Sequence, residues 1–215
     1  MSINCPSPQA LCDLLELFIG FFIFPEKELY EEINQGNIDL LIKELSQKAG
    51  LPIKSEFQAI PLNYAGWIDS YNRCFLGVEK PFAPPVESVY KVWTQDESFQ
   101  LPFKNQKGYL MGDSAQHIQH ILDYFGLVVP AEYSLMPDHL IILLELLIFL
   151  LDNNLEKEAK QLCIDHFDWL PDLQMAIANL ATDGEIYIYA LEILGKIIKG
   201  FVNNPSYTDS RSVQD

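Results

Sequence analysis

Basic residues are scarce in this 215-residue sequence. It has 14 Lys plus Arg against 30 Asp plus Glu, a formal net charge of -16 at pH 7. A field of this sign repels phosphate backbones and anionic lipid head groups, so nucleic acid is not an expected partner. It attracts cations, including a basic peptide segment, although many proteins are acidic only for solubility.

Cysteine is also scarce, and no Cys-x-x-Cys pair occurs. Widely separated cysteines are typical of a reduced intracellular protein, not of a disulfide framework. We therefore expect free thiols at Cys5, Cys12, Cys74 and Cys163. Cys163 lies on an apolar helical stripe, where a buried, unreactive thiol is the common case.

Catalytic signatures are missing: there is no Gly-rich phosphate loop, no Gly-x-Ser-x-Gly elbow and no His-Glu-x-x-His pair. The best candidate for a metal site is Asp113, His117 and His120, which share one side of a predicted helix. His120 falls opposite the apolar face and Asp113 is expected to cap the helix, so no metal is predicted. His166 with Cys163 lacks the second half of a zinc site, and core packing is expected there.

The sequence contains two apolar runs, and neither predicts membrane insertion. Residues 17–24 are apolar apart from one glycine, but acidic and not basic residues precede them, unlike the start of a signal peptide. We expect a buried first helix instead. Residues 140–151 are interrupted by Glu145 and are well short of the ~20 apolar residues that a bilayer requires.

Apolar side chains recur at helical spacing along most of the chain, and no segment alternates as a strand does. The sequence, 49% hydrophobic and 12% aromatic, can fill a core. The predicted fold class is all-α, a helical bundle, with Ser7, Asn37 and Asp113 as helix caps. The expected helices cover about residues 8–24, 37–49, 62–75, 113–126, 137–152, 155–167, 170–180 and 185–201.

Proline divides the predicted bundle. The prolines of the loop 77–87 fix the backbone and remove amide donors, which excludes a helix or a central strand there. Residues 128–137 also contain two prolines and lack a clear period. They are the candidate hinge between two unequal lobes, an N-terminal lobe of residues 1–130 and a C-terminal lobe of residues 131–202, with residues 203–215 as a flexible tail.

The helix expected over residues 137–152 is apolar nearly all the way round, as a helix in the centre of a bundle is. Its acidic residues Asp138, Glu145 and Asp152 are seven apart and so fall within about 40° of one edge. By itself, Asp138 suits either a first-turn carboxylate that favours the helix N-terminus or a carboxylate that faces a basic ligand.

Two separated segments carry the most specific pattern. In residues 73–90, an aromatic-rich helix runs into a Phe-x-Gly turn and a proline loop that ends Pro-Pro-x-x-Ser-Val-Tyr. In residues 136–140, Pro-Asp-His-Leu opens the hydrophobic helix, and residues 165–171 read Asp-His-Phe-Asp-Trp-Leu-Pro. Over about residues 11–201 the chain resembles the TorD/DmsD family of redox-enzyme maturation chaperones.

The resemblance implies an all-helical cytoplasmic chaperone, not an enzyme, with no cofactor or metal of its own. Its implied partners are the twin-arginine signal peptide and the apo catalytic subunit of a molybdopterin-containing oxidoreductase. It would assist cofactor insertion and delay export, as a monomer or a domain-swapped dimer. Carried over by position, the signal-peptide-binding residues are Tyr71, Phe75, Pro84, Pro85, Val86, Asp138 and His139.

The chemistry of these residues suits such a ligand. A twin-arginine leader combines two arginines with an apolar stretch, so its receptor needs carboxylates beside aromatic or aliphatic surface. Asp138 beside Phe75 and residues 84–86 would supply both. An alternative is a small helical hydrolase or nucleotide-binding protein that uses Asp138, His139 and Glu145 for acid–base work, and a third is a structural assembly subunit.

Overall fold

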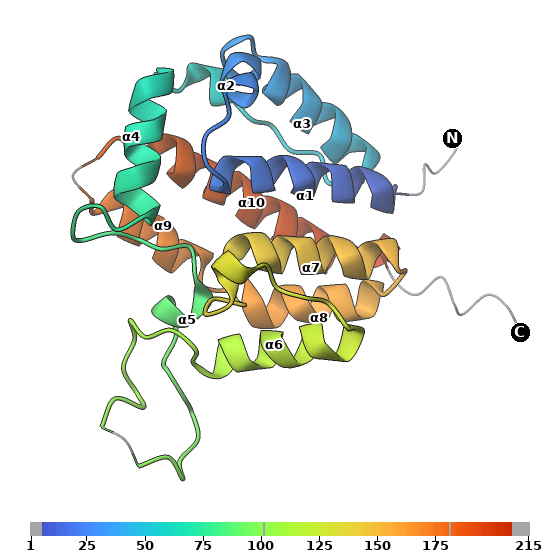
Figure 1. Cartoon of the computed structure of the whole chain (residues 1–215). Coiled ribbons are helices and arrows are strands. Elements are labelled where there is room, and N and C mark those ends of the chain that lie inside the picture. The colour runs from blue at the N-terminus through green and yellow to red at the C-terminus, as the bar shows by residue number, and fades with distance from the viewer. Residues whose placement is uncertain (1–5, 101, 181, 208–215) are drawn as a thin grey trace, which may run out of the picture.

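The computed structural model describes residues 6–100, 102–180 and 182–207 (Figure 1). The predicted all-α class is confirmed, since these residues form helices and one isolated β-bridge, without strands. Three short 3-10 helices are η1 (Phe57–Ala59), η2 (Ala131–Tyr133) and η3 (Pro205–Tyr207). The α-helices are α1 (Pro8–Phe22), α2 (Lys27–Asn34), α3 (Asn37–Lys48), α4 (Tyr64–Phe75), α5 (Glu87–Tyr90), α6 (Asp113–Phe125), α7 (Leu140–Asp152), α8 (Glu156–His166), α9 (Leu170–Ala178) and α10 (Glu185–Asn203).

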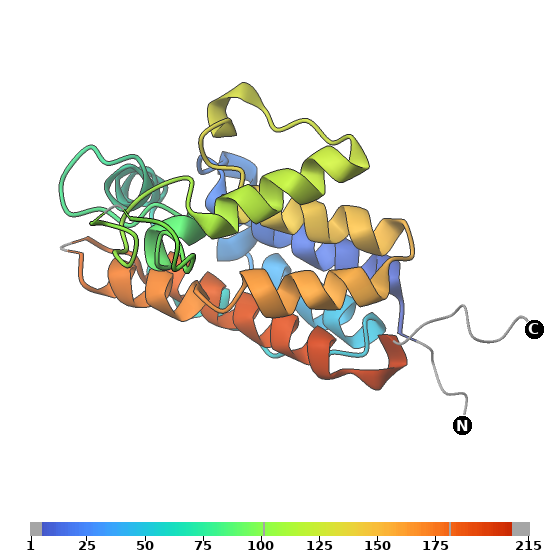
Figure 2. The same cartoon turned by 90° about the horizontal axis from the view of Figure 1, so that it is seen from below.

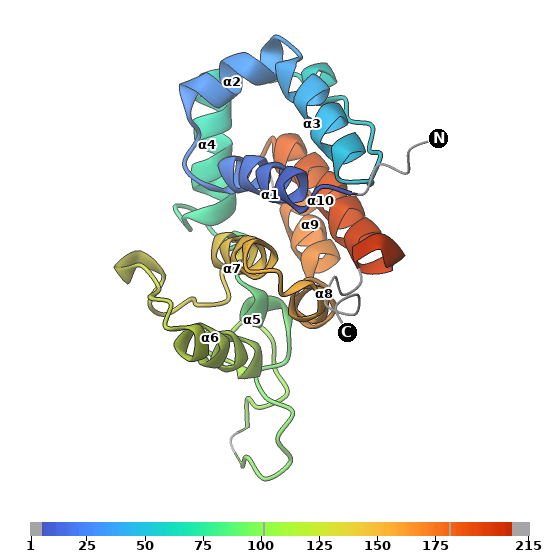
Figure 3. The same ribbon diagram turned by 90° about the vertical axis from the view of Figure 1, so that its right-hand side faces the viewer.

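The centre of the bundle is built on α1 and α7. Helix α1 packs against α3, α7 and α10, and α8 packs against both α7 and α10 (Figures 2 and 3). Nine of the thirteen residues of α7 are buried, which is why its sequence is apolar on almost every side. One apolar cluster includes residues of both predicted lobes. The division into residues 1–130 and 131–202 remains a prediction.

Helix α1 begins as predicted. The Ser7 side chain accepts a hydrogen bond from the Ala10 N–H at 3.2 Å, and Pro8 is the first helical residue. Phe18 and Phe21 have no exposed surface, so the apolar run is a buried first helix, as expected. Within the described residues no single helix is long and apolar enough to span a bilayer. Helices α1 and α2 reach that length and apolar character only when taken together, and their axes are bent by 111° relative to each other.

Two predicted helix caps are wrong by one residue. Helix α3 begins at Asn37 and α6 at Asp113, and the cap positions are Gly36 and Gly112. Gly36 has a φ of 76°, a left-handed conformation that glycine adopts without a steric penalty. The Asp113 carboxylate instead accepts hydrogen bonds from Thr94 and Gln95, which ties α6 to the preceding loop.

The predicted start of α7 was also too early. His139 has extended backbone angles and is the N-cap, so the helix begins at Leu140. Asp138 therefore lies outside the helix, and the predicted alignment of Asp138 with Glu145 and Asp152 along one edge is wrong. Only Glu145 and Asp152 lie on exposed positions of α7.

The predicted tail is partly corrected. Helix α10 extends to Asn203, and Tyr207 is only 4% exposed. The Tyr207 ring packs against Phe201 and its hydroxyl donates to the Ala49 carbonyl at 2.8 Å. One aromatic side chain thus anchors an otherwise polar segment. Residues 208–215 lie outside the described part of the chain.

The proline loop and the helices that follow it build the outer part of the molecule. Residues 77–86 contain no helix, as predicted, but Glu87, the last residue of the predicted loop, begins the single turn of α5. Figure 1 shows α6, α7 and α8 running in roughly the same direction, with α5 near one end of α6. The segment between α5 and α6 projects from the helical body (Figure 1).

Candidate functional site

The two segments that stand out in the sequence meet in the structure. Val86 and His139 form an isolated antiparallel β-bridge. Beside it, the Leu140 N–H donates to the Pro85 carbonyl at 2.8 Å. The proline loop and the start of α7 are therefore one unit, held by backbone hydrogen bonds.

Asp138 closes this junction from inside. It has no exposed surface, and its Oδ2 accepts a hydrogen bond from the Ser88 N–H at 2.6 Å. Burial raises the pKa of Asp138, the hydrogen bonds from Ser88 oppose the shift, and the nearby Glu87 charge adds to it. The carboxylate thus holds α5, and it is neither the first-turn residue of α7 nor an exposed ligand.

His139 has an equally structural position. It is 8% exposed, and its Nδ1 accepts a hydrogen bond from the Ile141 N–H at 3.2 Å. The imidazole is stacked obliquely on Tyr133, with ring centroids 4.7 Å apart. Burial lowers the pKa of His139 to about 4, so the ring is neutral at pH 7, with its proton on Nε2.

An apolar surface, here called the aromatic surface, lies along α4 and the proline loop. It consists of the exposed Phe24, Leu76 and Phe82, the partly exposed Tyr71 and the edge of the buried Phe75. The Tyr71 ring packs edge-on against Phe24 and Phe75, at 5.6 and 5.4 Å between centroids. Phe24 and Leu76 are 51% and 56% exposed. Apolar side chains that gather on a surface in this way are typical of a contact site for a partner.

The seven residues predicted to bind the signal peptide differ in their exposure to solvent. Tyr71 and Pro84 are partly exposed, and Phe75 and His139 keep a small exposed edge. Pro85, Val86 and Asp138 are buried, the last two completely. The structure brings the seven to one region, and their role in binding stays a prediction.

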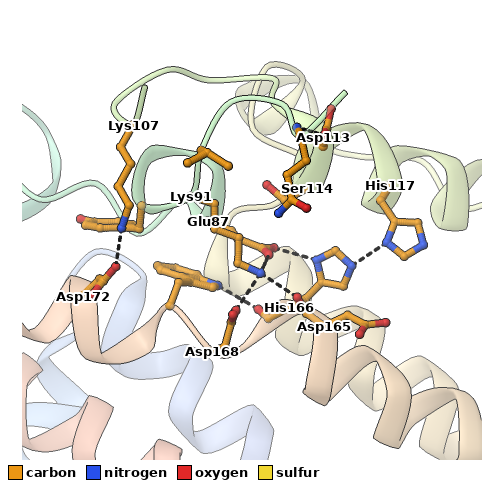
Figure 4. Close-up of a pocket in the computed structure, with 14 residues that line it drawn as sticks. Glu87, Lys91, Lys107, Asp113, Ser114, His117, Asp165, His166, Asp168 and Asp172 are labelled. Carbon is orange, nitrogen blue, oxygen red and sulfur yellow. Dashed lines mark hydrogen bonds and ion pairs between the residues drawn. The ribbon is translucent and has the colours of Figure 1, made fainter. Parts of the chain in front are cut away.

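A polar cavity on the other side of α5 was not foreseen from the sequence. It has a volume of about 670 Å³ and lies between α5, α6, α8 and α9 (Figure 4). The side chains labelled in Figure 4 that line it are Glu87, Lys91, Lys107, Asp113, Ser114, His117, Asp165, His166, Asp168 and Asp172.

A hydrogen-bonded chain of three side chains leads from the core into this cavity. Glu87 has no exposed surface, and its Oε2 accepts from His166 Nδ1 at 2.8 Å. His166 Nε2 lies 2.8 Å from His117 Nδ1 (Figure 4). Because a carboxylate only accepts, a neutral His166 carries its proton on Nδ1 and accepts one from His117. Burial lowers the pKa of His117, and the neighbouring His166 adds to this shift.

Lys91 completes the network around Glu87. Its Nζ lies 2.8 Å from Glu87 Oε1 and 2.7 Å from Asp168 Oδ1, and it donates to the Asp165 carbonyl at 2.7 Å. This ammonium therefore fastens α5 to the turn between α8 and α9. His166 is buried in the core as expected, at 2% exposed, and its partner there is the buried Glu87 carboxylate, which the sequence did not indicate.

The remaining candidates for catalysis or metal binding occupy structural positions. Cys12, Cys74 and Cys163 are buried free thiols, as predicted, and burial raises the pKa of Cys74 to about 11. Cys5 lies outside the described residues. Across residues 6–100, 102–180 and 182–207 no three His, Cys, Asp or Glu side chains are grouped to hold a metal ion. Asp138 and His139 are engaged with backbone N–H groups, which gives no support to the alternative acid–base site.

Comparison with models of protein families places this site in a known family. The model of the family described as nitrate reductase delta subunit matches residues 62–179, more than half of the chain. The family consists of chaperones for the maturation of molybdoenzymes, so the resemblance to TorD/DmsD chaperones is confirmed. The matched segment contains both the proline loop and the Asp138 junction. A search of curated proteins found no match.

Proposed function

Because the chain belongs to the nitrate reductase delta subunit family, we propose that it binds the twin-arginine signal peptide and the apo catalytic subunit of a molybdopterin-containing oxidoreductase. It assists cofactor insertion and delays export until maturation is complete. It acts in the cytoplasm, as a monomer or a domain-swapped dimer, without catalysing a reaction. The observation that carries this proposal is the family match across residues 62–179.

The aromatic surface is the proposed contact for the apolar part of the leader. Tyr71, Phe75, Pro84 and His139 contact the peptide in this proposal, since each has some exposed surface. Apolar surface removed from water contributes about 25 cal/mol per Å², so a leader that covers these side chains gains affinity without new charges. Pro85, Val86 and Asp138 act indirectly, by fixing the proline loop against α7.

Glu145 is the proposed partner for a leader arginine at this surface. It is exposed on α7. Burial raises the pKa of Tyr133, whose ring packs on His139, and the negative charges of Glu132 and Glu145 add to this shift. An exposed carboxylate beside aromatic rings matches a guanidinium, which both pairs with carboxylates and stacks on aromatic faces. It replaces the buried Asp138 as the direct acidic contact.

Calorimetry with a synthetic leader tests the proposal. We expect saturable binding that weakens by about tenfold or more when both arginines are replaced by Ala, since each charge-assisted hydrogen bond contributes about 1.5 to 3 kcal/mol. Tyr71→Ser should also weaken binding. The control is Met175→Ser. Met175 is 61% exposed and is not part of the aromatic surface. Equal affinity for the two peptides would reject arginine recognition.

A further inference from the structure

The polar cavity continues into a second, more apolar one. This cavity, of about 340 Å³, lies between α6 and α8, and His117, Asp165 and His166 line both cavities. The two together form one depression along α6 and α8, here called the α6–α8 groove. The apolar side chains of its second half are Ile121, Tyr124, Phe125, Leu150 and Leu162.

The first half of the groove has an excess of negative charge. Its two lysines are already paired, Lys91 with Glu87 and Asp168, and Lys107 with Asp172 at 2.9 Å. Asp113 accepts hydrogen bonds from neutral groups, and the Asp165 carboxylate accepts from the Gln161 amide at 2.9 Å. The carboxylates of Asp113 and Asp165 therefore keep their charge available for a cation from outside.

Tyr90 gives an independent indication of a ligand. It lines the polar cavity and is 9% exposed, and its hydroxyl has no hydrogen-bond partner among the described residues. Its ring is stacked on Trp169, with centroids 5.4 Å apart, which fixes its position. A buried hydroxyl without a partner destabilises the fold, and a ligand that brings a polar group to this part of the cavity wall would supply the partner.

We propose that the α6–α8 groove binds a polypeptide segment in which arginine or lysine residues lie beside apolar residues. The basic side chains enter the polar half, near Asp165, and the apolar ones cover Tyr124 in the other half. The proposal rests on the proposed function in one respect, that the segment belongs to the client protein. It assigns a second contact, separate from the aromatic surface.

Charge and polarity favour this occupant over others. An anionic ligand would be repelled by the unpaired carboxylates, and a wholly apolar segment would bury them without partners, which is costly. A small free cation would leave the apolar half empty. Tyr124 is 79% exposed, so this half offers apolar surface that a peptide can cover.

Two substitutions test the two halves of the groove, each with a matched control. Asp165→Asn removes a charge from an exposed residue whose carboxylate accepts from Gln161, four residues earlier. Asp123→Asn does the same on α6, where the partner is Gln119 at the same spacing and distance, 2.9 Å. Tyr124→Ser removes the apolar contact, and Val128→Ser changes another strongly exposed side chain, one that does not line the groove.

The probe is a fluorescent synthetic peptide of alternating leucine and alanine with one arginine at each end, so that it lacks the consecutive arginines of the leader. It is titrated into the full chain by anisotropy. Asp165→Asn and Tyr124→Ser should each weaken its binding by about fivefold, and both controls should leave it within about twofold. Added salt should weaken binding less steeply in the Asp165→Asn variant, because one attractive charge is gone. Probes with Gln for Arg, or Ser for Leu, should bind more weakly to the unmodified chain.

The outcomes separate this inference from the proposed function. If Tyr71→Ser weakens leader binding but neither groove variant affects the probe or the leader, the groove proposal is overturned and the leader assignment stands. If the leader fails to bind at all while the probe responds to both groove variants, the groove proposal stands and the proposed function fails. Equal responses of groove variants and matched controls would also overturn the groove proposal.

Discussion

Glu87 and Ser88 are neighbours in α5, yet they anchor it in two different ways. Ser88 binds the Asp138 carboxylate in a junction without exposed surface. Glu87 binds His166, and through it His117, which lines an open cavity. One side of α5 is thus closed and dry, and the other reaches solvent. The proline loop is therefore fixed on the closed side of α5, and the proposed α6–α8 groove lies on the other side.

The largest effect is expected from Glu87→Ala. It leaves the buried His166 without its carboxylate and Lys91 with Asp168 as its remaining carboxylate, and breaking a buried pair costs about 3 to 5 kcal/mol. The matched control is Glu192→Ala, which breaks an exposed pair with Lys196 at the same i, i+4 spacing and should cost less than about 1 kcal/mol. Urea unfolding at pH 7 measures both, and similar losses would contradict the assignment of Glu87 as the buried anchor.

Acidification should weaken the closed junction through His139. Its pKa is about 4 in the folded chain and 6.5 when unfolded, so at intermediate pH the unfolded state binds the extra proton. The stability is complete above pH 6.5 and declines as the pH falls to about 4, by about 3 kcal/mol in total.

The raised pKa of Asp138 acts in the opposite direction, because the folded state then takes up a proton first as the pH falls. Replacing His139 by Gln isolates the histidine contribution. The free energy of unfolding of the His139→Gln variant, measured between pH 4 and 8, should show a shallower pH dependence than that of the unmodified chain. Parallel curves would mean that His139 is protonated as easily in the folded state as in the unfolded one.

The next largest effect is expected at Asp138. Asp138→Ala leaves the buried Ser88 N–H without an acceptor, at a cost of about 1 to 3 kcal/mol. Asp138→Asn keeps an acceptor oxygen and should cost less than Asp138→Ala. Because Asp138 has no exposed surface, Asp138→Asn should leave leader affinity within about twofold. Loss of affinity with a shallower salt dependence would instead show direct contact with an arginine.

The helices were predictable because apolar periodicity reports burial directly. Helix α7 is the clearest case, since its run is apolar except at Glu145 and nine of its thirteen residues are buried. Its first residue was not predictable, since histidine is not among the common capping residues and Asp138 suited the first turn better.

The contact between Glu87 and His166 could not be predicted from the sequence. The two residues are 79 positions apart, and neither lies in a spacing pattern that indicates a pair. The resemblance drew attention to both segments, 73–90 and 165–171, but not to their contact. Periodicity identifies which face of a helix is buried, and it does not report which polar groups meet across the core.

The smallest effect is expected from a change at His117, on the cavity side of α5. His117→Ala removes the donor to His166 Nε2, but His117 is exposed and the cavity admits water, which can donate in its place. We therefore expect a loss of about 0.5 kcal/mol at pH 7, well below that of Asp138→Ala, whose partner has no access to water. The free energies of unfolding of the two variants, measured in urea, give the comparison directly. If His117→Ala is as destabilising as Asp138→Ala, the cavity side of α5 is as closed as the Asp138 side, and the contrast between the two junctions fails.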